Sequence, residues 1–345
     1  MEKAHRFNIY FYSFSKILTY KTQTKKVEPN FVDNAEFVCY NTLELFSNIA
    51  FFERFKLVIG YLLIFVFTLL SIGESVVVRT YAKRYGNGGF IMNAITALFS
   101  ALFFLVTDKG GFYVPAEMLP LAAINVCMFG VGFYFMYKAF QCGPYGLTRL
   151  ISEFSLVFTI FYGIIVLKEE TTPLTYVGIV MIFLAIILIN YKKSDNKDEQ
   201  KALSLKWVVS VTLTLVSNGF IGILTRMQQI RFNDACSNEF QFISIGGAFI
   251  LLTIIGLIVD KNKLGTVLKT GTLYGAMAGI FNGGRNFLTL IMFLHLPLSI
   301  LSPTITGMGM VASFAMALLY YKEKYSKLQY VGVILGASAV ILLAL

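Results

Sequence analysis

Polar side chains at helical spacing interrupt an apolar stretch in the second half of the chain. Arg285 stands between Asn282 and Asn286, and Thr289 continues the same helix face. A guanidinium is permanently charged, and its planar fork matches a carboxylate or a phosphate. The asparagines would orient a ligand bound by Arg285. We therefore expect a binding site for an anionic group here; the alternative is an arginine that only ties neighbouring helices together.

A second charged pair occurs in the first half. Arg149 and Glu153 are four residues apart, so they can form an ion pair on one face of a helix. Ser152 lies beside this pair, and the position equivalent to Ser152 in the repeat described below is Thr306. We expect these four side chains to contribute to substrate binding. A purely structural ion pair remains the alternative.

Two carboxylates are candidates for proton exchange. Glu153 would either pair with Arg149 or receive an ammonium group or a proton. Glu74 stands near one end of another apolar stretch, where burial would favour its protonated form. For Glu74 the preferred interpretation is nevertheless a structural or interfacial role near Arg79.

These residues lie in apolar stretches long enough to cross a membrane. Of the 345 residues, 57% are hydrophobic and 14% are charged, compared with about 25% charged residues in soluble domains. Stretches of about twenty apolar residues cross a bilayer as helices. We expect ten spans: Leu57–Val78, Phe90–Val106, Leu119–Phe140, Leu147–Leu167, Leu174–Tyr191, Trp207–Thr225, Phe240–Val259, Leu273–Leu294, Ile300–Tyr321 and Leu328–Leu345.

The chain contains an internal repeat. Lys168-Glu169 followed by Tyr176-Val177-Gly178 returns 154 positions later as Lys322-Glu323 followed by Tyr330-Val331-Gly332. The apolar stretches before these motifs carry small and hydroxyl side chains at equivalent positions. A repeat inside a membrane protein is typical of a transporter. Both glutamates stand at span ends beside lysines, so we expect caps or interface anchors and not ligands.

The repeat also predicts the fold. Because each half contains five spans, an odd number, the halves should enter the membrane in opposite directions. The expected fold class is an all-α integral membrane protein with ten transmembrane helices in two inverted five-helix repeats. The expected domains are an N-terminal tail at 1–56, a first repeat at 57–191, a polar linker at 192–206 and a second repeat at 207–345.

Glycine and proline predict two local features. Gly275, Gly279 and Gly283 form a row on one helix face, which is typical of close helix packing. In the next span, Pro303 and Gly307, with Gly309, predict a broken or bending helix of the kind that lines transporter cavities. An ordinary proline kink is the alternative.

Composition argues against several other classes of function. The net charge of +10 comes from Lys and Arg placed between the apolar stretches, so we expect no nucleic-acid partner. The chain has two histidines and four widely spaced cysteines, and we expect neither a metal nor a cofactor, and no enzymatic activity. The expected partners are a small-molecule substrate and the lipid bilayer, with a homodimer left open.

The repeat and its motifs resemble the drug/metabolite transporter superfamily, and within it the EamA-type transporters. The resemblance covers Leu57 to Leu345 and rests on the Lys-Glu steps and Tyr-Val-Gly entries in both halves. It implies a secondary carrier of small polar metabolites in the cell membrane, frequently an exporter of amino acids or related solutes, working by alternating access. A carrier of sugars, nucleotide sugars or phosphorylated metabolites is the alternative; a channel or a membrane-embedded enzyme fits less well.

Overall fold

The described part of the chain is helical. The structure is a computed structural model, and it describes residues 60, 62–107, 111–168, 172–190, 204–232, 236–295 and 298–344. No strand occurs among these residues. The predicted tail, 1–56, and most of the predicted linker, 192–206, lie outside them. For the described residues the predicted all-α class is confirmed.

Each predicted span falls on a helix of the described residues. Two 3₁₀ turns, η1 (Ala116–Met118) and η3 (Lys261–Lys263), precede α4 and α10. The first helix continues well beyond its predicted end at Val78, so Arg79 is helical. The helices are Leu62–Arg84, α3 (Gly89–Thr107), α4 (Leu119–Cys142), α5 (Tyr145–Glu153), α6 (Leu156–Ile165), α7 (Pro173–Asn190), α8 (Leu205–Arg231), α9 (Ser237–Val259), α10 (Leu264–His295), α11 (Leu298–Leu319) and α12 (Lys327–Ala344).

Several of these helices are long and apolar enough to cross a membrane. Within the described residues there are six such segments: Leu62–Arg84, Gly89–Thr107, Ala116–Cys142, Tyr145–Ile165, Leu205–Arg231 and Ser237–Val259. Shorter apolar helices cover Pro173–Ile189, Ile305–Leu319 and Lys327–Leu342. The protein is thus a multi-pass membrane protein, whereas ten crossing helices and their inversion stay predictions.

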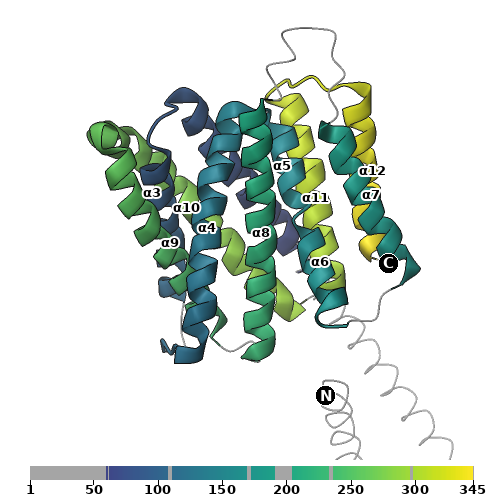
Figure 1. Cartoon of the computed structure of the whole chain (residues 1–345), viewed down its shortest axis with the longest axis horizontal. Coiled ribbons are helices and arrows are strands. Elements are labelled where there is room, and N and C mark those ends of the chain that lie inside the picture. The colour runs from purple at the N-terminus through teal and green to yellow at the C-terminus, as the bar shows by residue number, and fades with distance from the viewer. Residues whose placement is uncertain are drawn as a thin grey trace, which may run out of the picture. The chain divides into compact units, whose positions relative to one another are not determined.

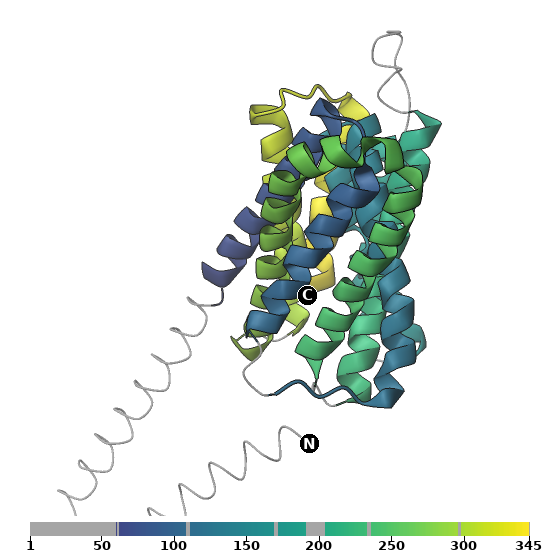
Figure 2. The ribbon, with the colours of Figure 1, turned by 90° about the vertical axis from the view of Figure 1, so that its left-hand side faces the viewer.

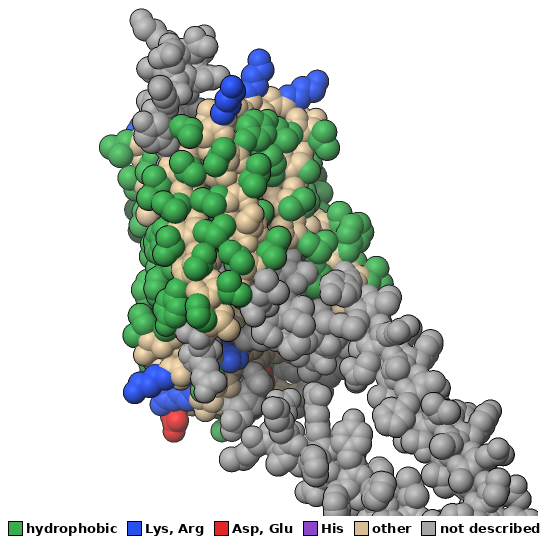
Figure 3. All heavy atoms as spheres, turned by 90° about the vertical axis from the view of Figure 1, so that its right-hand side faces the viewer, with side chains coloured by type: hydrophobic (Ala, Val, Ile, Leu, Met, Phe, Trp, Pro, Cys, Tyr) green, Lys and Arg blue, Asp and Glu red, His purple; other side chains and the backbone are tan. Residues whose placement is uncertain are grey.

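Large apolar side chains face outward and polar side chains face inward. Phe183, Ile187 and Ile334 are 48%, 59% and 66% exposed, whereas Ser100 and Asn282 are almost completely buried. Figure 3 shows the face of α7 and α12, where hydrophobic side chains cover the surface between Lys and Arg side chains at its two ends. An apolar surface of this kind is costly in water but stable in hydrocarbon. Polar groups inside a bilayer need partners within the protein, which explains why they are buried. Lipid is therefore the solvent of this face.

Helices from the two halves of the sequence pack against one another. α3 lies against α9 and α10, α4 against α8 and α9, and α7 along α12, while α5 contacts both α8 and α11 (Figure 1). The helix Leu62–Arg84 runs beside α10 (Figure 2). Gly73 of this helix faces the Phe281 ring of α10. The halves are therefore interleaved, and residues distant in sequence can meet in the interior.

The glycine row of α10 packs closely against α3, as predicted. A methyl group added to Gly279 would lie 2.5 Å from the Thr96 carbonyl oxygen, and one on Gly283 would lie 2.7 Å from Cβ of Phe103. Only a residue without a side chain allows two helices this close. The contact fixes the adjacent polar face of α10 against neighbouring helices and away from lipid.

Gly279→Ala should lower the stability of the protein by about 1–3 kcal/mol, because the methyl group meets backbone that cannot move aside without separating α3 from α10. The thermal unfolding midpoint of the purified protein measures this. Gly265→Ala is the matched control on the same helix, because no atom lies within 4 Å of its added methyl group. Equal midpoints for the two variants would contradict the close contact.

The sequence predicts a helix break in the second repeat, but the structure has it at the equivalent span of the first repeat. α11 continues through Pro303 and Gly307, so a break there is wrong, whereas a bend stays a prediction. Pro303 stands in the second turn of α11, where its missing N–H removes one intrahelical hydrogen bond without ending the helix. Instead, the span predicted at 147–167 divides into α5 and α6. At the division the N–H groups of Phe154 and Ser155 bond three residues back, to Ile151 and Ser152.

The two Lys-Glu motifs begin with the same backbone structure. Val166 and Leu167 both donate to the Tyr162 carbonyl, and Tyr320 and Tyr321, 154 positions later, both donate to that of Met316. The following lysines, Lys168 and Lys322, have φ angles of 52° and 51°, a left-handed conformation that is uncommon for residues other than glycine. The sequence repeat is therefore also a repeat of local structure at these helix ends.

Candidate functional site

A cavity of about 70 Å³ lies among five helices: Leu62–Arg84, α4, α5, α8 and α10. α4 contributes mainly apolar side chains, Phe129 and Phe140 among them. Pockets for drug-sized ligands have volumes of about 300–1,000 Å³, so this cavity must widen to admit a metabolite. The polar lining residues are Glu74, Ser75, Arg149, Thr214, Asn218, Asn282 and Arg285.

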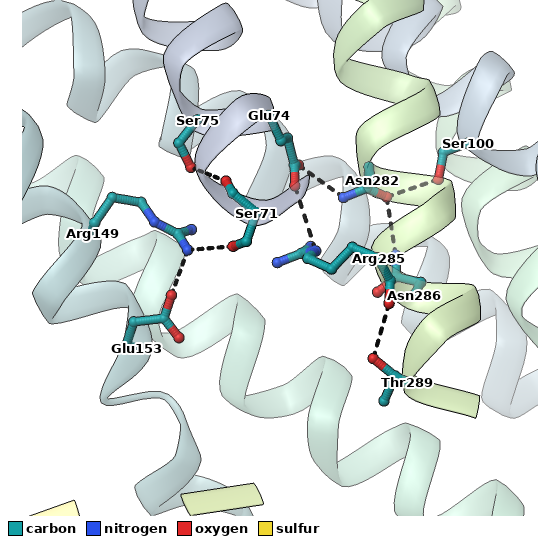
Figure 4. Close-up of polar contacts among 10 residues, drawn as sticks. All are labelled: Ser71, Glu74, Ser75, Ser100, Arg149, Glu153, Asn282, Arg285, Asn286 and Thr289. Carbon is teal, nitrogen blue, oxygen red and sulfur yellow. Dashed lines mark hydrogen bonds and ion pairs between the residues drawn. The ribbon is translucent and has the colours of Figure 1, made fainter. Parts of the chain in front are cut away.

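Glu74 is held by two side chains of α10. Asn282 Nδ2 donates to Glu74 Oε1 at 2.8 Å, and Arg285 Nε lies 3.5 Å from Glu74 Oε2 (Figure 4). The side-chain oxygen of Asn282, Oδ1, accepts from the Ser100 hydroxyl at 2.7 Å and from Asn286 Nδ2 at 3.0 Å. Asn282 is therefore fixed by α3 and by its own helix, and it fixes Glu74 in turn.

The Arg285 side chain has a hydrogen-bond donor without an acceptor among the described residues. Its Nε is buried and has no hydrogen-bond partner among the described residues, since 3.5 Å from Glu74 is too long for a hydrogen bond. The Thr289 hydroxyl donates to the main-chain carbonyl of Arg285 at 3.1 Å and not to its guanidinium. A buried donor without an acceptor costs free energy. An anionic ligand that supplied the acceptor would remove this cost.

Arg149 reaches the cavity from α5. Its Nη2 lies 2.5 Å from Glu153 Oε1 and donates to the Ser71 hydroxyl at 2.8 Å, so the predicted ion pair is confirmed. The Arg149 side chain is 6% exposed, and its Nε is also buried without a hydrogen-bond partner among the described residues. Figure 4 shows Arg149 and Arg285 extending toward each other from opposite sides.

The charges around the cavity balance. Arg149 and Glu153 form one pair, and Arg285 and Glu74 form the other. Pairing offsets part of the desolvation cost that isolated charges would have inside a bilayer. The four charges sum to zero, and each guanidinium also keeps a buried Nε without a hydrogen-bond partner among the described residues.

Several predicted site residues lie behind the cavity lining. Asn286 and Glu153 support the lining residues Asn282 and Arg149. The Ser152 hydroxyl donates to the Thr148 carbonyl at 2.9 Å, and Thr306 is buried on α11. Of the predicted binding residues, the structure thus brings Arg149, Asn282 and Arg285 to the cavity itself, and Glu74, predicted only as a proton-exchange candidate, joins them there.

The predicted role of Glu74 needs correction. Sequence reasoning preferred a structural place near Arg79, but Glu74 pairs with Arg285, and Arg79 pairs with Glu323 at 2.9 Å. Five residues along a helix correspond to a rotation of about 140°, so Glu74 and Arg79 point in different directions. Glu74 belongs to the cavity.

Sequence reasoning also missed polar residues on two helices. Ser71 and Ser75 flank Glu74 at helical spacing, and Ser75 lines the cavity. On α8, Thr214 and Asn218 line the opposite wall at a spacing of four residues. Such polar faces on apolar helices are the signal that could have identified them.

The comparisons with known proteins agree with this architecture. Residues 58–191 match the family model described as "EamA-like transporter family", which confirms the resemblance to the drug/metabolite transporter superfamily for that part of the chain and indicates a membrane transporter. A solved structure entitled "Crystal structure of protein" is similar over 82% of this chain and 95% of its own, with a TM-score of 0.55 and 12% sequence identity. That likeness concerns the fold alone. No curated protein matches the chain.

Proposed function

We propose that this chain, which carries an EamA-like transporter domain at residues 58–191, is a secondary transporter of a small polar metabolite in the cell membrane. The substrate is an amino acid or a related solute. Its anionic group binds Arg285, while Asn282 orients that group and the Arg149–Glu153 pair completes the site. Alternating access moves the substrate across, with export as the expected direction.

One observation carries the proposal: Arg285 extends into the cavity with a buried Nε that has no hydrogen-bond partner among the described residues. Guanidinium groups inside a bilayer normally need acceptors, because an unsatisfied charged donor is costly there. A substrate carboxylate would supply them in bidentate geometry.

The balanced charge favours an amino acid over a phosphorylated solute. A zwitterion adds no net charge to a site whose two arginines already face Glu74 and Glu153. A phosphate dianion would leave the site negative, and charge without compensation is expensive at this depth. Glu74 is the better placed of the two carboxylates to exchange a proton, because it lines the cavity and Glu153 does not.

The pairing of equivalent helices supports alternating access. α5 packs against α11 and α7 against α12, and the bounds of α7 shifted by 154 positions are those of α12. Contacts between equivalent elements are what two inverted halves around a pseudo-two-fold axis would form. Rocking of one half against the other would then expose the cavity to each side in turn.

A ligand screen followed by a flux measurement tests this function. Amino acids, sugars, nucleotide sugars and sugar phosphates are screened for a rise in melting temperature, since a ligand at a hundred times its Kd stabilises a protein by about 2.7 kcal/mol. The solute that stabilises the protein should then show saturable counterflow in proteoliposomes. If Glu74 couples transport to protons, an imposed pH gradient should drive uptake by the wild type and not by Glu74→Gln.

The possible results distinguish the classes of function. If only sugar phosphates raise the melting temperature, the substrate is a phosphorylated metabolite and not an amino acid. Unsaturable currents would indicate a channel, and product formation without net solute movement would indicate an enzyme. Absence of both stabilisation and counterflow across the panel would contradict the proposed transporter of amino acids or related solutes.

A further inference from the structure

Three segments meet beside the cavity in a cluster that the proposed substrate site does not use. Arg79 comes from the helix Leu62–Arg84, and Tyr145 is the first residue of α5. Tyr321, Glu323 and Tyr325 belong to the segment that joins α11 to α12. We call these five residues the Glu323 cluster.

Glu323 holds the N-terminus of α5. Its carboxylate accepts hydrogen bonds from the backbone N–H of Tyr145 at 2.6 Å and of Gly146 at 3.0 Å, where a helix has unpaired donors and a partial positive charge. The same carboxylate lies 2.9 Å from Arg79 Nη2 and accepts from the Tyr325 hydroxyl at 2.6 Å. One carboxylate therefore links segments from both halves of the chain.

The aromatic side chains of the cluster continue into the cavity wall. The Tyr145 ring is stacked on that of Phe140, with centroids 5.6 Å apart, and contacts the Tyr321 ring at 4.8 Å. Cζ of Arg79 lies 4.1 Å from the Tyr321 ring centroid, within cation–π range. Phe140 lines the cavity, and so does Val78, the neighbour of Arg79. The cluster thus adjoins this end of the cavity.

The Glu323 cluster has several strong contacts, but three of its buried polar atoms lack hydrogen-bond partners among the described residues. Arg79 Nη1 and the hydroxyls of Tyr145 and Tyr321 are buried without hydrogen-bond partners among the described residues. Water would satisfy these atoms if the cluster opened, so their burial offsets part of the stabilisation from the Glu323 contacts. Burial and the neighbouring Glu323 carboxylate raise the pKa of the Tyr325 phenol, which therefore remains a donor at neutral pH.

We propose that Glu323 and Arg79 form a gate at this end of the cavity, and that Glu323 also positions Arg149 by holding the first turn of α5. Arg149 stands one turn after Tyr145, so release of this turn frees the helix segment that carries the guanidinium. Opening the gate and moving Arg149 are then one event. This inference rests on the proposed transport function.

Chemical access to the cavity tests the gate. In the full-length protein in sealed vesicles, the four native cysteines are replaced by alanine, and Ser75→Cys provides a thiol in the cavity. Glu323→Gln removes the charge that attracts Arg79 and weakens the hold on α5. We expect a charged, membrane-impermeant thiosulfonate to label this thiol about tenfold faster, a factor that corresponds to about 1.4 kcal/mol. The rise should occur only from the side of the α11–α12 segment, which labelling of the exposed Lys324→Cys identifies.

Further variants make the test decisive. Arg79→Gln breaks the same ion pair without removing the cap on α5, and it should give a rise from the same side even if Glu323→Gln folds poorly. Glu117→Gln is the control, because this exposed carboxylate lies 4.0 Å from Arg231 and is remote from the cluster in sequence and contacts. Unchanged labelling in both test variants, an equal rise with Glu117→Gln, or a rise from both sides would overturn the gate. Labelling needs no transported solute, so this failure is distinct from failure of the proposed function.

Discussion

Arg285→Ala should weaken binding of the transported solute by about 30-fold or more. Removing one partner from a buried charge pair costs about 2 kcal/mol at least, and every 1.4 kcal/mol is a factor of ten in Kd. The loss combines two effects: the substrate's anionic group loses its guanidinium, and Glu74 keeps its charge without the ion pair observed at 3.5 Å. The dissociation constant, taken from the ligand dependence of the melting temperature, measures this change.

A second pair of variants separates the two effects. Arg285→Ala with Glu74→Gln removes both charges, so it should regain stability but not affinity. Arg285→Lys keeps the charge and loses the bidentate fork, so its affinity should fall between those of the wild type and Arg285→Ala. Arg231→Ala is the matched control, since Arg231 is 63% exposed and its pair with Glu117 is weak. Wild-type affinity in Arg285→Ala would exclude Arg285 from the site.

The sequence predicts the helices well because the bilayer imposes their length. Every predicted span coincides with one helix, except the span 147–167, which coincides with α5 and α6 together. About twenty consecutive apolar residues have no stable non-helical arrangement in hydrocarbon. Local spacing also predicts contacts within one helix. Arg149 and Glu153 pair as their spacing requires, and Asn282 and Asn286 bond on α10.

Contacts between helices could not be predicted in this way. Glu74 meets Asn282 across 208 positions, and Glu323 meets Tyr145 across 178. Helical periodicity shows which side chains share a face, but which faces meet depends on close packing, such as that of Gly279 against α3. The division between α5 and α6 could not be predicted either, because neither glycine nor proline stands between Glu153 and Leu156. A 3₁₀ turn in mid-helix is often a hinge, and this one directly follows the carboxylate that holds Arg149.

The small and hydroxyl side chains that precede the first Lys-Glu motif include Thr148 and Ser152 of α5, and their contacts are structural. Thr148 Oγ1 accepts the Trp207 indole N–H at 2.8 Å and donates to the Pro144 carbonyl. Ser152 donates to the Thr148 carbonyl on its own helix. These hydroxyls satisfy local groups and allow α5 to pack closely, so they support the site without lining the cavity.

Arg149→Met should destabilise the protein by about 3–5 kcal/mol, because it leaves Glu153, only 19% exposed, as a buried charge without its partner. Arg149→Met combined with Glu153→Gln should recover most of this loss, since no unpaired charge remains. Denaturant titration of the purified variants measures the free energy of unfolding. The exposed pair Arg231 and Glu117 is the control cycle, where the coupling should not exceed about 1 kcal/mol.

Transport by the recovered double variant then separates a structural pair from a functional one. If Arg149 and Glu153 only stabilise the fold, Arg149→Met with Glu153→Gln should carry solute at the wild-type rate once it is stable. If the Arg149 guanidinium binds substrate in the cavity, the same variant should be folded but inactive. Its Kd for the solute should rise, whereas a purely conformational defect would slow counterflow at unchanged Kd. For Glu323→Gln, the proposed gate predicts slower counterflow at unchanged Kd. This variant leaves the Arg149 guanidinium in place but loosens the helix turn before it.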